Sequence, residues 1–302
     1  MSHGNRWRLP RKRVRITIRA PVTLVCMTPL LLAVIVAGAA SAFCWIASLV
    51  TRDYSWVDRL WSIVPVVYVW IFAAGAGLAD PRLDVMAILV TAWGARLTYN
   101  FARKGGYSGV EDYRWPVLRA RMSPAGWHLF NLFFIVLFQN ALLLAIALPA
   151  QTALEHSVVS ANPTPFGVLD VVLALAFLAF LAGETIADQQ QWDFHRAKHA
   201  GGPDFEPRFV QTGMWKYSRH PNYFFEQAQW WMVLGFGMVA AGTVLVWSAV
   251  GAIVLVVLFI GSTVFTESIT RGKYPEYAQY QARVSPIVPW PPRRTAALKS
   301  RA

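Results

Sequence analysis

Long apolar segments alternate with shorter polar connections along most of the chain. Several of these segments exceed the roughly 18 apolar residues that an α-helix needs to cross a bilayer. The pattern predicts an all-α, polytopic membrane protein with about seven transmembrane helices. The predicted helices occupy residues 24–50, 60–79, 84–102, 126–149, 165–186, 226–242 and 244–266.

The connections between these segments differ in charge, and this difference predicts an orientation. Loops 103–125 and 187–225 and the tail after residue 266 each carry several Lys or Arg residues, whereas the connection 150–164 carries none. Basic residues concentrate in the loops that stay in the cytoplasm. We therefore expect the three basic regions to be cytoplasmic, in a bacterial inner membrane.

The N-terminus does not fit this orientation. Seven spans with a cytoplasmic tail place residues 1–20 outside, yet this stretch is the most basic of the chain. Either the first segment does not cross, or one of the seven helices is wrongly assigned, or the polypeptide starts at Met27. We expect a basic extension over 1–23, a single transmembrane domain over 24–290 and a basic tail over 291–302.

Composition agrees with a membrane protein and argues against two other classes. Of the 302 residues, 56% are hydrophobic and 15% are charged, which is not the balance of a soluble domain. The net charge of +12 would suit nucleic acid, but the basic residues lie beside apolar segments, where they attract anionic headgroups. We expect membrane lipids, and no nucleic acid, as partners.

Metal binding and cysteine redox chemistry find little support in the sequence. His195 and His199 have the spacing that places two imidazoles on one helix face, but the chain has only six histidines. Cys26 and Cys44 lie far apart on one predicted helix and cannot pair with each other. We expect no metal site.

The densest polar stretch lies between two apolar segments, at residues 215–226 (WKYSRHPNYFFE). Its charged and amide side chains stand next to Gln229 and two tryptophans of the following predicted helix. Such groups are costly beside hydrocarbon and usually line a cavity filled with water or ligand. We expect this stretch to form part of a polar site at the membrane boundary.

Three consecutive elements carry polar residues at helical spacing on the side expected to be cytoplasmic. Residues three or four apart lie on one helix face. Any one of these polar faces could serve only to hold neighbouring helix ends together. Three polar faces at the same membrane depth favour a shared cavity for a ligand with phosphate and hydroxyl groups. The faces are Glu184, Asp188, Gln191 and His195; Asn222, Glu226 and Gln229; and Glu267 with Arg271.

Three segments together resemble the C-terminal region of the steroid 5α-reductase family. More closely, they resemble a bacterial branch of membrane proteins, DUF1295, that is grouped with those reductases. The resemblance extends over about residues 165–290, while the first four helices match mainly in VDRLW and ARLTYNFARK. The three segments are GETIADQQQWDFHR, EPRFVQTGMWKYSRHPNYFFE and YPEYAQYQARVSPIVPW.

The resemblance implies a seven-helix fold that holds NADPH at its cytoplasmic half. It also implies an enzyme that reduces a conjugated C=C bond of a lipid or steroid-like substrate. Glu184 stands where the reductases carry an Asn, so that contact is altered. The cofactor-binding residues that we expect from the resemblance and the polar faces are Glu184, Asp188, Arg196, Arg208, Tyr217, Arg219, Asn222, Tyr223, Glu226, Glu267 and Arg271.

Reduction of a conjugated C=C bond needs a positioned acid, because negative charge develops on the carbonyl oxygen. The steroid enzymes of the family use a Gln-Glu pair on the second helix and a Tyr on the third. Tyr99 fills the Tyr position, but the second helix has no such pair and offers only Asp58. We expect Tyr99, with Asp58 as second choice, to be catalytic. Each residue also has a purely structural explanation: Tyr99 as an aromatic side chain at the membrane interface, and Asp58 as a carboxylate that stabilises a helix N-terminus.

Two other functions stay open. Isoprenylcysteine carboxyl and phospholipid methyltransferases, which use S-adenosylmethionine, share an Arg-His-Pro-x-Tyr turn and a Glu before a Tyr-rich tail, as at 219–223 and Glu267. That cofactor has no phosphates, so Arg196 and Arg208 favour NADPH. A transporter would show internal repeats and polar groups at mid-bilayer, and the sequence shows neither.

Overall fold

The computed structural model of the chain describes residues 27–160 and 162–293, and within them every regular element is a helix. The predicted extension 1–23 and most of the tail 291–302 lie outside the described residues. The elements are α1 (Pro29–Thr51), α2 (Trp56–Leu60), α3 (Val64–Gly75), α4 (Pro81–Arg103), α5 (Arg114–Arg119), α6 (Pro124–Phe130), the π-helix η1 (Asn131–Phe138), α7 (Gln139–Val159), α8 (Val168–Ala200), the 3-10 helix η2 (Gly213–Lys216), α9 (Pro221–Ala241), α10 (Ala249–Lys273) and α11 (Tyr277–Arg283).

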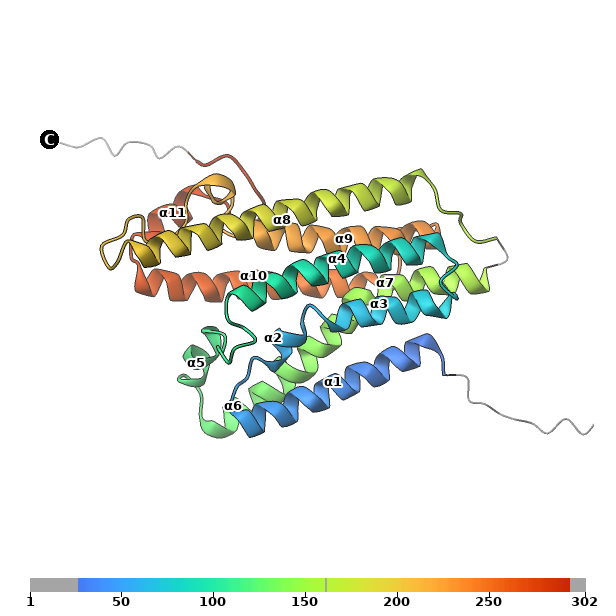
Figure 1. Ribbon diagram of the computed structural model, residues 1–302, viewed down its shortest axis with the longest axis horizontal. Helices are drawn as coiled ribbons and strands as arrows, with labels where there is room; N and C mark the ends of the chain where they lie inside the picture. The colour runs from blue at the N-terminus through green and yellow to red at the C-terminus, as the bar shows by residue number, and fades with distance from the viewer. Residues whose placement is uncertain (1–26, 161, 294–302) are drawn as a thin grey trace, which may run out of the picture.

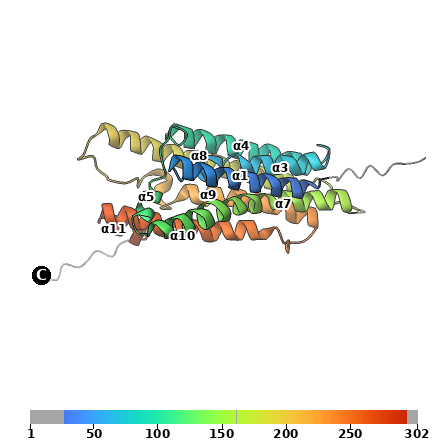
Figure 2. The same cartoon turned by 90° about the horizontal axis from the view of Figure 1, so that it is seen from below.

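The long helices run along one common axis and form a bundle (Figure 1). Helices α3, α4 and α8 lie in one layer and α7, α9 and α10 in a second, with α1 along one edge (Figure 2). The short helix α2 lies further inward, between α1 and α3, while the short helices α5 and α11 lie at the end of the bundle where α8 and α10 finish. We call this end the polar end.

Four helical segments of the described residues are long and apolar enough to cross a membrane. They are α1, the continuous helix Pro124–Val159, α8 and α10, and α3 is a shorter apolar helix. Helices α4 and α9, with 23 and 21 residues, match these spans in length but carry more polar residues. The chain is an all-helical, polytopic membrane protein, as the apolar pattern predicts.

Six of the seven predicted apolar segments correspond to long helices, and the segment 60–79 contains the shorter helix α3; α8 extends much further than expected. It continues beyond residue 186 to Ala200 and has 33 residues. A helix of this length measures roughly 50 Å, whereas the hydrocarbon core is about 30 Å thick. The last turns of α8 therefore lie outside the apolar layer, at the polar end.

Local sequence explains where the helices that carry polar side chains begin. The Asp80 carboxylate accepts hydrogen bonds from the backbone N–H groups of Arg82 and Leu83, at 2.9 and 3.1 Å, and caps α4. Pro81 occupies the first position of α4, where its missing N–H would have no partner. Pro221 starts α9 in the same way, directly after the Arg-His pair of the polar stretch.

At the end opposite the polar end, a buried ion pair joins the starts of α4 and α8. Arg82 Nε and Nη2 donate to the Asp170 carboxylate at 2.6 and 3.0 Å. The same guanidinium donates to the carbonyls of Thr164 and Pro165, at 3.1 and 3.0 Å. Because both charged side chains are almost fully buried, the pair holds α4 and α8 in a fixed register.

Helices α7 and α10 approach each other closely because α10 has a glycine at the crossing. A Cβ atom at Gly251 would overlap the backbone carbonyl of Ala145. Small residues permit such contacts between membrane helices. Gly261, on the same helix, has open space where its Cβ would lie.

We expect the substitution Gly251→Ala to separate α7 from α10 and to lower the melting temperature of the detergent-solubilised protein by several degrees. Overpacking of this kind costs roughly 1–3 kcal/mol. The matched control Gly261→Ala should melt with the wild type, and equal melting temperatures for the two variants would contradict this packing.

Candidate functional site

One arginine faces three carboxylates where α4, α8 and α9 meet. Arg96 on α4 forms ion pairs with Glu184 and Asp188 on α8 and with Glu226 on α9. Its Nη1 lies 2.6 Å from Asp188 Oδ2, and its Nη2 lies 3.6 Å from Glu226 Oε2. The carboxylates are buried, and the Arg96 side chain is only 11% exposed. We call these four residues the Arg96 cluster.

Three amide side chains donate hydrogen bonds to the carboxylates of the Arg96 cluster. Asn100 Nδ2 and Asn222 Nδ2 donate to the two oxygens of Asp188, at 2.7 and 3.3 Å. Gln229 Nε2 donates to Glu184 Oε2 at 2.7 Å. Each amide therefore turns its nitrogen toward negative charge, which is the favourable orientation.

Two tryptophans complete the shell around Glu226. Trp93 Nε1 donates to its Oε2 at 3.0 Å, and Trp230 Nε1 donates to its Oε1 at 3.2 Å. The two indole rings meet edge to face, with 4.8 Å between their centroids. Both oxygens of this carboxylate are therefore fixed by buried donors from α4 and α9.

The sequence interpretation missed the α4 side of this cluster. Trp93, Arg96, Asn100 and Arg103 follow one another at steps of 3, 4 and 3, which places them on one helix face. In the sequence, Arg96 and Arg103 stood out only as part of the motif ARLTYNFARK around the predicted catalytic residue Tyr99. The spacing of these four residues could have indicated a polar helix face. It could not show whether the face with Tyr99 or the face with Asn100 is turned toward α8.

The Arg96 cluster offers more acceptors than the protein fills. It has three carboxylates against one guanidinium. Among the described residues, Asn222 Oδ1 and Gln229 Oε1 are buried without a hydrogen-bond partner, and Arg96 Nε is a buried donor without one. Buried polar atoms are normally paired, so these three atoms are hydrogen-bonding positions that the described residues leave open.

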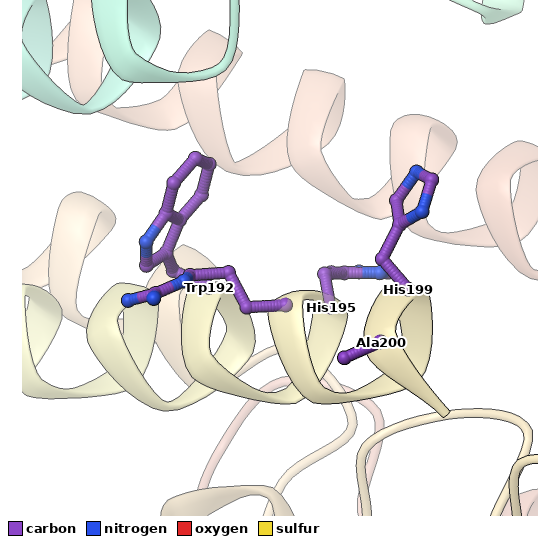
Figure 3. Close-up of a pocket in the computed structure, with 5 residues that line it drawn as sticks. Trp192, His195, His199 and Ala200 are labelled. Atoms are coloured by element: carbon purple, nitrogen blue, oxygen red, sulfur yellow. The ribbon is translucent and has the colours of Figure 1, made fainter. Parts of the chain in front are cut away.

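An open cavity of about 460 Å³ lies along the last turns of α8, beyond the Arg96 cluster. Its size is within the usual range of small-molecule sites. The side chains of Trp192 and His199 project from the same side of α8 (Figure 3). The lining residues are Trp192, His195, Arg196, His199 and Ala200. We call this space the α8 cavity.

Arg103 connects the α8 cavity with the Arg96 cluster. Its guanidinium lies 5.0 Å from the centroid of the Trp192 ring. It also donates to Gln189 Oε1 at 2.7 Å and to the backbone carbonyl of Asp188 at 3.3 Å. Arg103 therefore contacts both a side chain that lines the α8 cavity and the backbone of a residue of the Arg96 cluster.

A second buried carboxylate, Glu267 on α10, collects donors from the polar stretch and from α11. Arg219 Nε and Nη2 donate to it at 2.5 and 3.0 Å, and Gln281 Nε2 donates at 2.8 Å. His220 Nε2 and the Tyr277 hydroxyl each lie 3.2 Å from Glu267 Oε1. In this Glu267 cluster the charge of Arg219 is already neutralised.

The predicted cofactor residues are divided among these places rather than gathered in one shared cavity. Arg219 and Glu267 belong to the Glu267 cluster, and Tyr223 stacks on His220 with 4.9 Å between ring centroids. Arg196 lines the α8 cavity. The Arg96 cluster and its amides contain the predicted residues Glu184, Asp188, Asn222 and Glu226.

Three predicted cofactor residues lie apart from both clusters. Arg208 pairs with Glu206 at 2.9 Å in the segment between α8 and η2. Tyr217 is nearly half exposed and follows η2. Arg271 is exposed near the end of α10. Their roles in cofactor binding stay predictions.

The two predicted catalytic residues also lie outside the Arg96 cluster. Tyr99 is 65% exposed, and the Arg103 guanidinium lies 5.5 Å from its ring centroid. Asp58 lies on α2 and accepts a hydrogen bond from Trp115 Nε1 at 3.1 Å. Burial and the nearby Asp112 carboxylate raise the pKa of Asp58 to about 6, a range that suits a general acid. Their catalytic roles stay predictions.

Comparison with known proteins identifies related chains. The family model of DUF1295, described as a protein of unknown function, matches residues 44–284. An uncharacterised protein of Schizosaccharomyces pombe is 37% identical over 262 residues, which cover 81% of this chain and 75% of the relative. No solved structure matches this chain.

Removing Arg96 should destabilise the protein strongly. Loss of one partner from a buried charge cluster costs about 3–5 kcal/mol, because the opposite charges stay buried without compensation. We expect Arg96→Met to lower both the yield of monodisperse protein in mild detergent and its melting temperature.

Neutralising one carboxylate should offset this effect. The double variant Arg96→Met with Glu184→Gln is expected to recover part of the lost stability, while Arg121→Met, on an exposed arginine, should behave as wild type. Wild-type stability of Arg96→Met alone would mean that the cluster does not hold the helices together.

Proposed function

The chain belongs to DUF1295, a steroid 5α-reductase-like family, and on this premise we propose that it is an integral-membrane reductase. The proposed cofactor is NADPH, and the proposed substrate is a lipid or steroid-like molecule with a C=C bond conjugated to a carbonyl. We further propose that the polar end faces the cytoplasm of a bacterium, because the basic connections lie there.

The observation that supports this proposal best is the continuous polar face of α8. Glu184, Asp188, Trp192, His195 and His199 follow one another at steps of 4, 4, 3 and 4. The face is roughly 22 Å long at 1.5 Å per residue. Along this face the side chains change from carboxylates inside the bundle to an indole and imidazoles in the open α8 cavity. The length and polarity of the face suit a dinucleotide.

The chemistry of this face fits NADPH. Carboxylates and the unpaired oxygens of Asn222 and Gln229 can accept hydrogen bonds from a carboxamide NH2 and from ribose hydroxyls. Arg196, in the α8 cavity, can bind phosphate bidentately, and Trp192 offers a face for stacking. The nicotinamide end would thus lie toward the Arg96 cluster and the phosphates toward solvent.

Bound NADPH supplies a hydride to the β-carbon of the substrate, and the chain must bind the substrate and polarise its carbonyl. We assign polarisation to the Tyr99 hydroxyl, because its exposed ring lies where a bilayer molecule can reach it. Arg103 beside that ring also contacts the backbone of Asp188, which links the two parts of the site. Asp58 is the second choice as proton donor.

One observation favours a second candidate, a methyltransferase that uses S-adenosylmethionine. The Arg-His-Pro-Asn-Tyr turn and Glu267, which such enzymes share, form one contiguous unit here through Arg219 and His220. The surplus of carboxylates in the Arg96 cluster would also attract a sulfonium cation.

The nucleotide that accompanies the protein distinguishes these candidates. The full chain is purified in mild detergent, and small molecules released by denaturation are identified by mass spectrometry. NADP(H) supports the reductase, whereas S-adenosyl compounds would replace it with the methyltransferase.

A matched pair of carboxylate variants tests the assigned site. We expect Asp188→Asn to weaken NADPH binding at least about ten-fold, because a hydrogen bond to a charged group contributes roughly 1.5–3 kcal/mol. Asp193→Asn makes the same change on an exposed residue of the same helix and should bind as wild type. Isothermal titration of NADPH into both variants measures this difference, and equal affinities would refute the assignment.

A further inference from the structure

A second open cavity, of about 310 Å³, lies between α11 and the segment that follows it. Arginines at three places in the sequence line it, and none of its lining residues is acidic. It shares no lining residue with the α8 cavity. The side chains that matter here are Arg219, Arg283, Trp290 and Arg293. We call this space the tail cavity.

Backbone hydrogen bonds give the tail cavity a defined shape. The N–H of Arg219 donates to the carbonyl of Ser285 at 2.8 Å, which ties the segment to the polar stretch before α9. Further along, the N–H of Arg293 donates to the carbonyl of Arg283 at 2.9 Å. The chain therefore reverses direction after α11, and the backbones of Arg283 and Arg293, ten positions apart, are hydrogen-bonded to each other.

These two arginines are the cations of the tail cavity whose charge is not neutralised. Arg219 is paired with Glu267, but Arg283 and Arg293 are exposed and form no ion pair within 27–160 and 162–293. The remaining residues of the chain contain no Asp or Glu that could pair with them. Two unpaired guanidinium-bearing side chains that line one cavity are a favourable site for a phosphate.

The rim of the tail cavity is apolar and lies where a membrane surface is expected. Trp290, which lines the cavity, is 69% exposed, and Val288 in the same segment is 58% exposed; the segment 285–292 contains four prolines. The segment follows closely on α10, a candidate span that ends at Lys273. Exposed tryptophan is typical of the membrane–water interface, whereas a site for a soluble anion needs no such apolar rim.

We propose that the tail cavity binds the headgroup of an anionic phospholipid. Arg283 and Arg293 contact its phosphate, and Trp290 and Val288 contact the glycerol and upper acyl chain. This site is independent of the proposed NADPH site, because it contains no residue of α4 or α8. It fixes the segment after α11 to the membrane surface.

Native mass spectrometry of the full chain tests the proposal. Protein in mild detergent is stripped of lipid and then offered phosphatidylglycerol or phosphatidylcholine. The wild type should retain one phosphatidylglycerol in preference to phosphatidylcholine. The double variant Arg283→Ala with Arg293→Ala should lose this retention by roughly ten-fold or more, since each basic residue contributes to binding at an anionic surface.

Matched measurements separate the alternatives. The control Arg121→Ala with Lys273→Ala removes the same charge from exposed residues elsewhere and should retain the lipid. Equal retention by the tail variant, or equal retention of phosphatidylcholine, would overturn the proposal. So would a rise in melting temperature with inorganic phosphate alone that matches the rise with phosphatidylglycerol, because the site would then bind free anions.

NADPH titration of the double variant distinguishes this proposal from the proposed reductase. Unchanged NADPH affinity together with lost lipid retention supports a separate lipid site. Loss of NADPH affinity in the same variant would assign the two arginines to the cofactor and would overturn the lipid proposal.

Discussion

Buried carboxylates in a bundle surrounded by lipid must find their donors within the protein, because hydrocarbon offers none. The Arg96 cluster meets this constraint with one guanidinium, three amides and two indoles from α4 and α9. None of the three helices can slide or rotate without leaving a charge unpaired. The buried pair Arg82–Asp170 applies the same constraint near the starts of α4 and α8, so that the two helices are joined at two separate places.

The distribution of charge at the polar end follows from the same constraint. Acidic groups inside the bundle are held by arginine, amide and indole donors, while arginines near the surface either bind a carboxylate, as Arg219 does, or stay exposed, as Arg283 and Arg293 do. If NADPH binds along α8 as proposed, the basic rim would hold its anionic phosphates and the interior its uncharged nicotinamide end. The same rim beyond α11 suits anionic headgroups, since solvent-exposed arginine attracts phosphate without a burial cost.

Much of the fold could be predicted because bilayer burial depends on composition over long windows. The apolar segments predicted the long helices, and the 4–3–4 spacing of Glu184, Asp188, Gln191 and His195 indicated that the helix continues past its apolar part. The exact extent of α8 and the short helices α2, α5 and α11 were not predictable from apolar runs. The end of α8 and these short helices lie at or near the polar end, outside the long apolar segments, where hydropathy no longer distinguishes helix from loop.

The sequence by itself determined which residues share a helix face, because the spacing of three and four is a local property of the backbone. It could not decide between the face of Arg96 with Tyr99 and the face of Arg96 with Asn100, which overlap in sequence. Only the packing of α4 against α8 brought Asn100 to Asp188 and left Tyr99 exposed. Likewise, only the position of α10 directed Arg219 to Glu267, since contacts between residues 48 positions apart depend on how helices pack and not on their periodicity.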